Sequence, residues 1–131
     1  MQLNEKQTIA FTLMKEGKNV FITGPGGVGK TALIKKFKND QSKYINIAIT
    51  STTGTSALLL NGTTLHSFLG IKTGSGSIES MVMDIQKKSP ARKKWKTVDC
   101  LIIDEISMLD PDLFDKLEHM ARIIRNNKKP F

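Results

Sequence analysis

The chain has 131 residues, 39% of them hydrophobic, and carries a formal net charge of +8 with an isoelectric point near 9.7. This length suffices for one modest domain with a core of its own, and the composition excludes a disordered chain. Its single cysteine, Cys100, excludes an internal disulfide and is expected as a small buried hydrophobe, and no apolar run approaches the ~20 residues of a membrane span.

The first predicted element is a helix that begins after Asn4 and ends at Gly17. Asn4 is a good N-cap residue, and Gln7 stands at the position that completes a capping box. Four hydrophobic side chains at helical spacing are expected to form its buried face: Ile9, Ala10, Leu13 and Met14.

A glycine-rich segment follows between a predicted buried strand at residues 19–23 and a predicted helix from Lys30 to about Asn39. Its spacing, a glycine, four residues, then Gly-Lys-Thr, is that of a phosphate-binding loop. Glycines let backbone N–H groups surround a phosphate, and the helix start adds its positive dipole end. A flexible glycine turn is the alternative interpretation.

This loop predicts a nucleotide site in which Lys30 reaches the β- and γ-phosphates and the Thr31 hydroxyl binds Mg²⁺. The residues expected to bind the nucleotide phosphates are Gly24, Gly26, Gly27, Val28, Gly29, Lys30 and Thr31.

The next elements are a loop at residues 40–42, a β-branched strand at 44–50 and a polar turn at 51–56. Ligand contacts in open α/β sheets gather where strands end, as this turn does. A helix is predicted at residues 57–60, closed by Asn61 and Gly62. A glycine/serine loop at 70–77 precedes another helix, expected from the helical spacing of Ile78, Met81, Val82 and Ile85.

A third strand is predicted at residues 98–105, and it ends in two carboxylates, Asp104 and Glu105. Asp104 is expected to hold the Mg²⁺ shell opposite Thr31, and Glu105 to orient or deprotonate an attacking water. Neighbouring strand residues point in opposite directions, so the pair must lie where the strand turns into a loop. The alternative is a capping or solvent-facing acid pair.

Asp110 and Pro111 then open a predicted helix as cap and first residue. Its expected buried stripe is Leu113, Leu117, Met120, Ala121 and Ile124. His119 is expected on the helix surface, without a metal-ligand partner.

Most of the excess positive charge lies in two clusters. The first contains Lys87, Lys88, Arg92, Lys93, Lys94 and Lys96, and the second contains Arg122, Arg125, Lys128 and Lys129. Such clusters favour a polyanionic partner, nucleic acid first, but a solvated face is an equally open interpretation. Trp95, within the first cluster, is expected to pack.

Four stretches together resemble the Pif-type DNA helicases, in the RecD-like branch of superfamily one. They are the loop at residues 24–31, a Thr-Gly-Thr-Ser-Ala segment at 53–57, the segment 62–71 with Thr-Leu-His-Ser-Phe, and Asp-Glu-Ile-Ser-Met-Leu within 101–109. The last two are far more specific than a glycine loop, and the resemblance extends from about Leu3 onward.

The resemblance implies an α/β P-loop NTPase fold, a RecA-like three-layer domain with a mainly parallel sheet. It implies an enzyme that hydrolyses ATP with Mg²⁺, moves five-prime to three-prime on single-stranded DNA and unwinds duplex or forked DNA. The implied processes are DNA repair, recombination, and genome or telomere maintenance. A monomeric, soluble, intracellular protein without a membrane partner is expected, and the N-terminus lacks a secretory signal pattern.

By the same resemblance, Gln7 contacts adenine, a role open alongside its capping role. A DNA-contact segment is expected at residues 52–71, with contacts from Thr53, Gly54, His66, Ser67 and Phe68. Phe68 is suited to stacking on a base and the polar groups to holding phosphates. Ordinary turn and core packing is the alternative for these five residues.

The chain departs from the family pattern after the acidic motif. The family continues into a strand with a Gly-Asp…Gln motif and a second motor domain, whereas this sequence stops at Phe131. We therefore expect residues 1–131 to be an incomplete first motor domain, inactive by itself. A non-motor P-loop ATPase and a nucleic-acid-binding fragment are the alternative functions.

Overall fold

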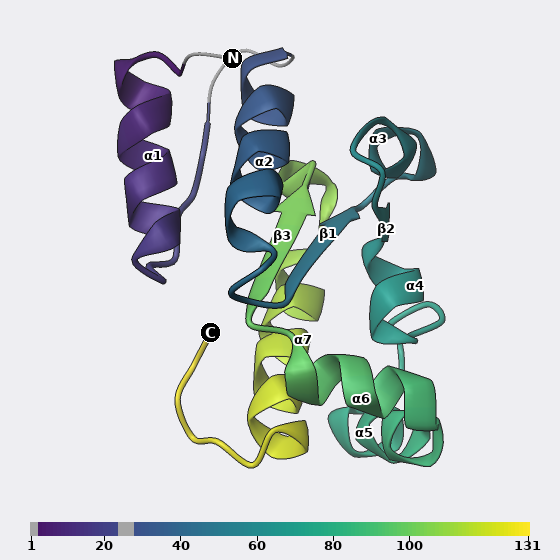
Figure 1. Cartoon of the computed structure of the whole chain (residues 1–131). Helices are drawn as coiled ribbons and strands as arrows, with labels where there is room; N and C mark the ends of the chain where they lie inside the picture. The colour runs from purple at the N-terminus through teal and green to yellow at the C-terminus, as the bar shows by residue number, and fades with distance from the viewer. Residues whose placement is uncertain (1–2, 24–27) are drawn as a thin grey trace. The chain divides into compact units, whose positions relative to one another are not determined.

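The computed structural model describes residues 3–23 and 28–131, which form the helices and short strands labelled in Figure 1. By its internal contacts the chain divides into two compact units, Met1–Ile47 and Ala48–Phe131. Each unit is described by itself.

The first unit contains two helices, α1 (Glu5–Lys15) and α2 (Val28–Gln41). The Asn4 side chain accepts a hydrogen bond from the Gln7 backbone N–H at 2.8 Å, and the Asn4 N–H donates to Gln7 Oε1 at 2.9 Å. This reciprocal pair confirms the predicted capping box. Gly17 follows the helix with a φ of +80°, a left-handed conformation that glycine adopts without strain.

The face of α1 that packs on α2 is only partly the predicted one, because Ala10 and Met14 are half-buried as expected but Ile9 and Leu13 are exposed. Phe11 meets Phe37 of α2 edge to face, with ring centroids 5.9 Å apart. Gln7, one turn earlier on the same face, also bonds to α2. Ile9 and Leu13 instead remain 55% and 37% exposed. The predicted stripe includes Ile9 and Leu13 wrongly, because the packed face continues through Phe11 and a polar residue, Gln7.

The predicted strand at residues 19–23 is wrong, because the structure assigns no strand there. Phe21, expected in a buried strand, is 74% exposed. A strand exists only through backbone bonds to a neighbouring strand, and this segment belongs to no sheet in the described parts of the chain. A local apolar run carries no information about that neighbour.

Helix α2 continues through the predicted loop as far as Gln41. The backbone N–H groups of Tyr44 and Ile45 both bond to Gln41 O, which extends the helix end as a turn. The following strand therefore starts at Ile47 instead of Tyr44.

The sheet consists of β1 (Ile47–Ser51), β2 (Thr63–Thr64) and β3 (Cys100–Asp104), in the order β2-β1-β3. β1 and β2 are parallel, with Thr50 opposite Thr63. The arrows of β1 and β3 also point the same way in Figure 1. The carboxyl ends of β1 and β3 therefore share one edge of the sheet.

Two short helices follow β1 and β2. Helix α3 (Gly54–Leu59) starts earlier than predicted, because Thr53 caps it by accepting a hydrogen bond from the Ser56 N–H at 3.2 Å. Helix α4 (Leu65–Leu69) ends at Gly70 in a left-handed conformation. Between them, a Cβ on Gly62 would collide with the backbone oxygen of Ile49, so the chain requires glycine there.

The core of the second unit lies among α4, α5 (Ile78–Lys87), α6 (Ser89–Thr97) and α7 (Pro111–Ile124). The predicted helix after the glycine/serine loop is confirmed as α5. The predicted cap and buried stripe of α7 are also confirmed: Asp110 accepts from the Asp112 N–H at 2.9 Å, and all five predicted side chains are buried. Within the described ranges, no helix combines the length and apolar character that crossing a bilayer requires.

Candidate functional site

The described part of the predicted phosphate loop forms the first turn of α2. Lys30 and Thr31 lie there, both half-buried, directly after Gly29. The turn contains no acidic residue, so no carboxylate of its own offsets the positive dipole end of the helix. Gly24, Gly26 and Gly27 lie outside the described residues, and Val28 is described only as the residue that opens the helix.

Gln7 connects α1 to this turn. While its Oε1 completes the capping box, its Nε2 donates to the Gly29 backbone oxygen at 2.9 Å. A Cβ on Gly29 would lie 3.1 Å from Nε2, so glycine permits this close approach. The predicted capping role is therefore confirmed. The contact also places the Gln7 amide beside the first turn of α2, and its adenine contact stays a prediction.

The acidic pair lies at the end of β3. Asp104, half-buried, is the last strand residue, and Glu105, exposed, has left-handed backbone angles of φ 56° and ψ 43°. A 3₁₀ turn, η1 (Ile106–Met108), follows at once. The prediction that the pair lies where the strand turns into a loop is confirmed.

Hydroxyl and amide groups that follow β1 hold the backbone of this pair. The Thr52 N–H donates to Asp104 O at 3.2 Å, and Thr52 Oγ1 donates to Glu105 O at 2.9 Å. Ser51 Oγ adds a third bond to Asp104 O at 3.3 Å. The carboxyl end of β1 thus fixes the position of the acidic turn.

Ser56, in the first turn of α3, is a site residue that the sequence interpretation missed. Its Oγ donates to Asp104 Oδ2 at 2.5 Å. No other described residue bonds to the Asp104 carboxylate. Only the strand order, with β1 beside β3, brings the two residues together, although a hydroxyl just after a strand was a visible signal.

The oxygen donors here suit magnesium. Mg²⁺ takes hard oxygen ligands and commonly uses one or two carboxylates together with substrate phosphates. Among the described residues, no group of three or more His, Cys, Asp or Glu side chains is placed to form a protein-only metal centre. The Asp104 carboxylate is thus of a chemical type that binds Mg²⁺ together with phosphate oxygens.

The five residues expected to contact DNA lie on the two segments that follow β1 and β2. Thr53 caps α3 and Gly54, exposed, is its first residue. In α4, Ser67 is exposed, His66 is half-buried, and half-buried Phe68 packs against the core. Figure 1 shows α3 and α4 on the same side of β1, with β2 between them. The packing alternative is therefore partly realised for Phe68.

The remaining predicted side chains are less central. Trp95 is 3% exposed and its Nε1 donates to Leu69 O at 2.8 Å, which confirms a packing role. His119 is exposed on α7, as expected. Cys100 is half-buried, and burial, followed by the negative charge of Asp99, raises the pKa of its thiol.

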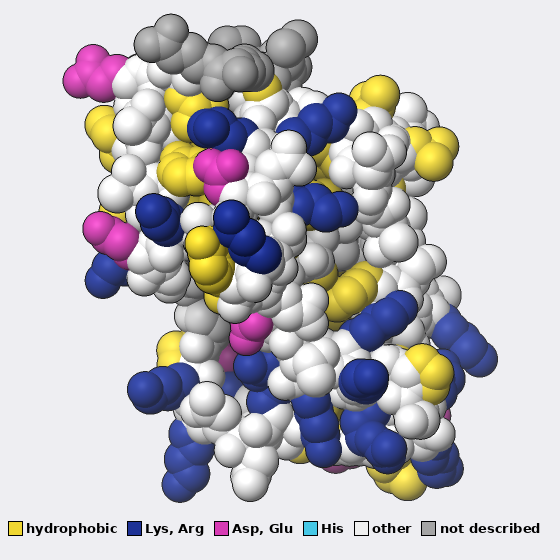
Figure 2. Space-filling model, in the orientation of Figure 1, with side chains coloured by type: hydrophobic (Ala, Val, Ile, Leu, Met, Phe, Trp, Pro, Cys, Tyr) yellow, Lys and Arg dark blue, Asp and Glu magenta, His cyan; other side chains and the backbone are white. Residues whose placement is uncertain are grey.

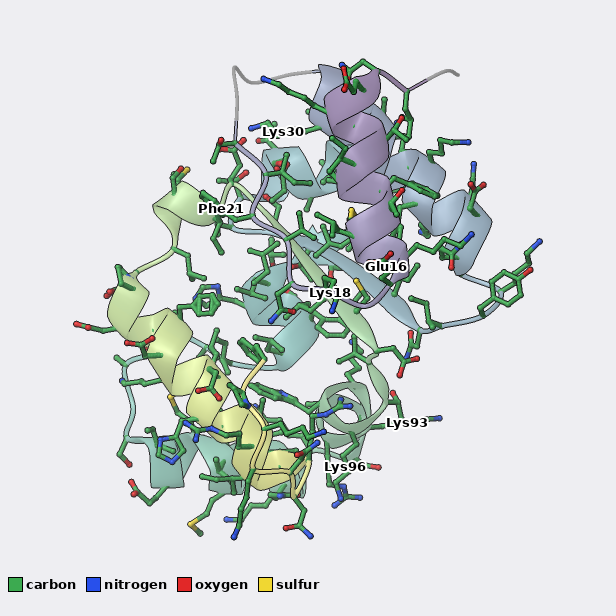
Figure 3. The ribbon with its side chains drawn as sticks, turned by 90° about the vertical axis from the view of Figure 1, so that its left-hand side faces the viewer. Glu16, Lys18, Phe21, Lys30, Lys93 and Lys96 are labelled. Carbon is green, nitrogen blue, oxygen red and sulfur yellow. The ribbon has the colours of Figure 1, made fainter. Side chains whose placement is uncertain are left out.

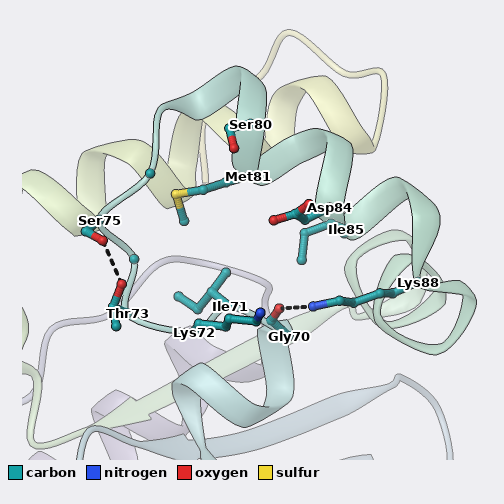
Figure 4. A pocket seen from close by; sticks show the side chains of 12 residues that line it. Gly70, Ile71, Lys72, Thr73, Ser75, Ser80, Met81, Asp84, Ile85 and Lys88 are labelled. Atoms are coloured by element: carbon teal, nitrogen blue, oxygen red, sulfur yellow. Dashed lines mark hydrogen bonds between the residues drawn. The ribbon is translucent and has the colours of Figure 1, made fainter.

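A pocket of about 160 Å³ lies between residues 70–76 and α5. Figure 4 shows Asp84 and Ser80 on one side of it and Lys72 on the other, with Lys88 Nζ 3.5 Å from Gly70 O. None of the predicted site residues lines this pocket.

The chain is similar in sequence to known proteins over almost its whole length. A sequence model of the family described as PIF1-like helicase matches residues 2–131. Protein 030L of Invertebrate iridescent virus 6 is 53% identical over 99% of this chain and 26% of its own length. The ATP-dependent DNA helicase PIF1 of Emericella nidulans is 42% identical over 98% of this chain and 18% of its own length.

The fold of the chain is also similar to those of solved Pif1 helicase structures. The crystal structure of Pif1 helicase from Candida albicans superposes with a TM-score of 0.95 and 33% identity, covering 99% of this chain and 30% of that one. Pif1 helicase from Bacteroides in complex with ADP-AlF3 and single-stranded DNA gives 0.76 and 30%, covering 99% and 30%.

The α/β fold with a small parallel sheet is thus shared with Pif1 helicases and agrees with the predicted RecA-like class. The chain spans only about a quarter or less of the two relatives' lengths. On the family match over nearly its whole length, the chain belongs to the PIF1-like helicase family.

Proposed function

We propose that this chain carries the phosphate-binding and part of the DNA-binding surface of an ATP-dependent DNA helicase. The observation that carries the proposal is the acidic pair after β3, held by hydroxyls from residues 51–56, in a chain that belongs to the PIF1-like helicases. Movement from five-prime to three-prime, and service in DNA repair, recombination and telomere maintenance, are part of the proposal.

The nucleotide half of the proposal assigns one role to each predicted residue. Backbone N–H groups of residues 24–29 and the first turn of α2 bind the phosphates of ATP, and Lys30 donates to the β- and γ-phosphates. Thr31 and Asp104 supply oxygen ligands for Mg²⁺, which neutralises phosphate charge when bound. Glu105 accepts a proton from the attacking water at its carboxylate. Gln7 contacts adenine with the hydrogen-bonding capacity that its cap leaves free.

The DNA half assigns phosphate and base contacts to Thr53, Gly54, His66, Ser67 and Phe68. The exposed Ser67 hydroxyl and the uncrowded Gly54 backbone suit phosphate contacts. Thr53 and Gly54 directly follow Thr52, whose hydroxyl bonds to the backbone of the acidic turn. In this proposal one continuous segment therefore both contacts DNA and positions the acidic residues used in hydrolysis.

The test is nucleotide binding by variants of a lysine pair on α2. Lys30→Ala removes the proposed phosphate contact, and Lys35→Ala removes an equal charge from an exposed position on the same helix. Loss of a charged hydrogen bond predicts roughly 10- to 100-fold weaker binding of a fluorescent ATP analogue for Lys30→Ala alone. Titration with and without Mg²⁺ measures it.

Equal affinities of the two variants for the ATP analogue would contradict the proposed nucleotide site. If single-stranded DNA binding then persisted in both, a nucleic-acid-binding protein without ATP chemistry would be the better assignment.

A further inference from the structure

The helix α6 is fixed firmly to α4. Ala91 and Trp95 are its two buried residues and lie one turn apart, so they define its inner face. Trp95 Nε1 donates to Leu69 O, the last residue of α4, in a buried hydrogen bond of 2.8 Å. On the outside, Lys94 Nζ lies 5.4 Å from the centre of the Phe68 ring. The outer face of α6 is therefore continuous with the segment proposed to contact DNA.

The cations of the first basic cluster do not all do the same thing. Arg92 donates to Gln86 O at 2.9 Å, and Lys88 to Gly70 O at 3.5 Å, so these two connect parts of the fold. Lys93 and Lys96 are exposed and bond, by their side chains, to no other described residue. Figure 3 shows both extending from α6 away from the ribbon.

Helix α6 brings no acidic residue of its own to this face. The ion pairs Lys36–Asp40 and Arg122–Glu118 both lie outside α6. The α6 sequence itself, residues 89–97, contains no Asp or Glu. Figure 2 shows Lys and Arg side chains gathered over α5 and α6 with few acidic ones between them.

A structural explanation covers only part of this pattern. Cations in the last turn of a helix interact favourably with its dipole, and Lys94 and Lys96 are so placed. Like charges at helical spacing, such as Arg92 with Lys96, oppose that gain. The dipole explains neither the missing acids nor the position of Lys93 earlier in the helix.

We propose that Lys93 and Lys96 of α6 bind phosphates of the DNA backbone, with Lys94 beside Phe68 joining this face to α4. This inference rests on the proposed DNA-binding function and extends it to a surface outside residues 52–71. Phosphate is the matching ligand, because the exposed ammonium groups of Lys93 and Lys96, which bond to no other described residue, recognise charge and not the identity of a base. The face therefore adds affinity without sequence preference.

Paired variants of equal charge test the proposal. Lys93→Ala/Lys96→Ala removes two cations from α6, and Lys128→Ala/Lys129→Ala removes two from the exposed end of the second cluster. Binding of fluorescent dT20 to the full 131-residue chain is measured by anisotropy across a salt series. For the α6 variant we expect roughly tenfold weaker binding at low salt, and a slope of log affinity against log salt lower by about 1.4, about 0.7 per lost contact. The control should remain near the unchanged chain.

Each other outcome is decisive. Equal losses of dT20 affinity in the two double variants would mean that only net charge matters. An unchanged salt dependence of the α6 variant would mean that Lys93 and Lys96 contact no phosphate. Either result would overturn this inference but not the proposed function. Absence of dT20 binding by the unchanged chain would overturn the proposed function as well. Circular dichroism of Lys93→Glu/Lys96→Glu, which should lose still more affinity, checks that α6 remains folded.

Discussion

A few side chains determine the backbone conformation of the acidic turn at residues 104–105. Glu105 adopts a left-handed conformation that is uncommon for a residue with a side chain. The bonds from Thr52 and Ser51 to the backbone around it hold the chain in that conformation. The strained residue is also the proposed general base, which matches the tendency of such conformations to cluster at functional sites.

Ser56 provides a prediction at this scale. Its hydroxyl orients one oxygen of the Asp104 carboxylate, so Ser56→Ala should leave the fold intact and weaken metal binding. Loss of a group that orients a metal ligand typically costs 10- to 100-fold in metal affinity. We expect about a tenfold higher Mg²⁺ concentration at half-saturation for binding of a fluorescent ATP analogue.

Thr55→Ala is the matched control, because Thr55 is exposed in the same turn and makes no bond to the acidic pair. If Ser56→Ala and Thr55→Ala required the same Mg²⁺ concentration, Ser56 would have no positioning role.

At the scale of elements, local sequence patterns correctly predicted the features that depend only on nearby residues. The α1 capping box and the α7 cap and buried stripe depend on residues within a few positions of one another, and both are confirmed. The start of α3 was misplaced because Thr53 was not recognised as its cap. A cap lies within one turn of its helix, so Thr53 is itself a local signal for where α3 begins.

What depends on distant partners was not predictable. The prediction of a strand at residues 19–23 is wrong because a strand must pair with a neighbouring strand, and no local sequence pattern specifies which strand that is. Likewise, both the acidic motif and the polar turn after β1 were recognised. Their contact through Ser56 follows only from β1 lying beside β3.

Docking of α6 on α4 gives the element-scale prediction. Trp95→Phe keeps an aromatic ring in the core but leaves the Leu69 carbonyl without its buried donor. An unsatisfied buried acceptor costs about 1–3 kcal/mol, so the free energy of unfolding should fall by that amount. Urea unfolding followed by circular dichroism measures it.

Ser107→Ala, which removes an exposed hydroxyl from the same unit, should change stability by less than about 0.5 kcal/mol. A Trp95→Phe variant as stable as this control would show that the bond to Leu69 contributes little to docking.

At the scale of the whole molecule, coverage limits the activity to expect. In the proposed function, movement along DNA depends on domains that open and close around the nucleotide. The chain spans 18% of the Emericella nidulans helicase and 26% of protein 030L. In our proposal, binding of nucleotide and DNA needs only the local surfaces described above, whereas stepping needs relative motion of larger bodies.

We therefore expect the 131-residue chain to bind DNA in a salt-dependent manner but not to separate strands. A forked duplex with a fluorophore and quencher on opposite strands, incubated with ATP and Mg²⁺, should show no release above a sample with a non-hydrolysable ATP analogue. That comparison is necessary because a chain of net charge +8 traps single strands by charge alone, which changes the signal without hydrolysis. ATP-dependent release abolished by Lys30→Ala would contradict the prediction, since it would place a complete motor within these residues.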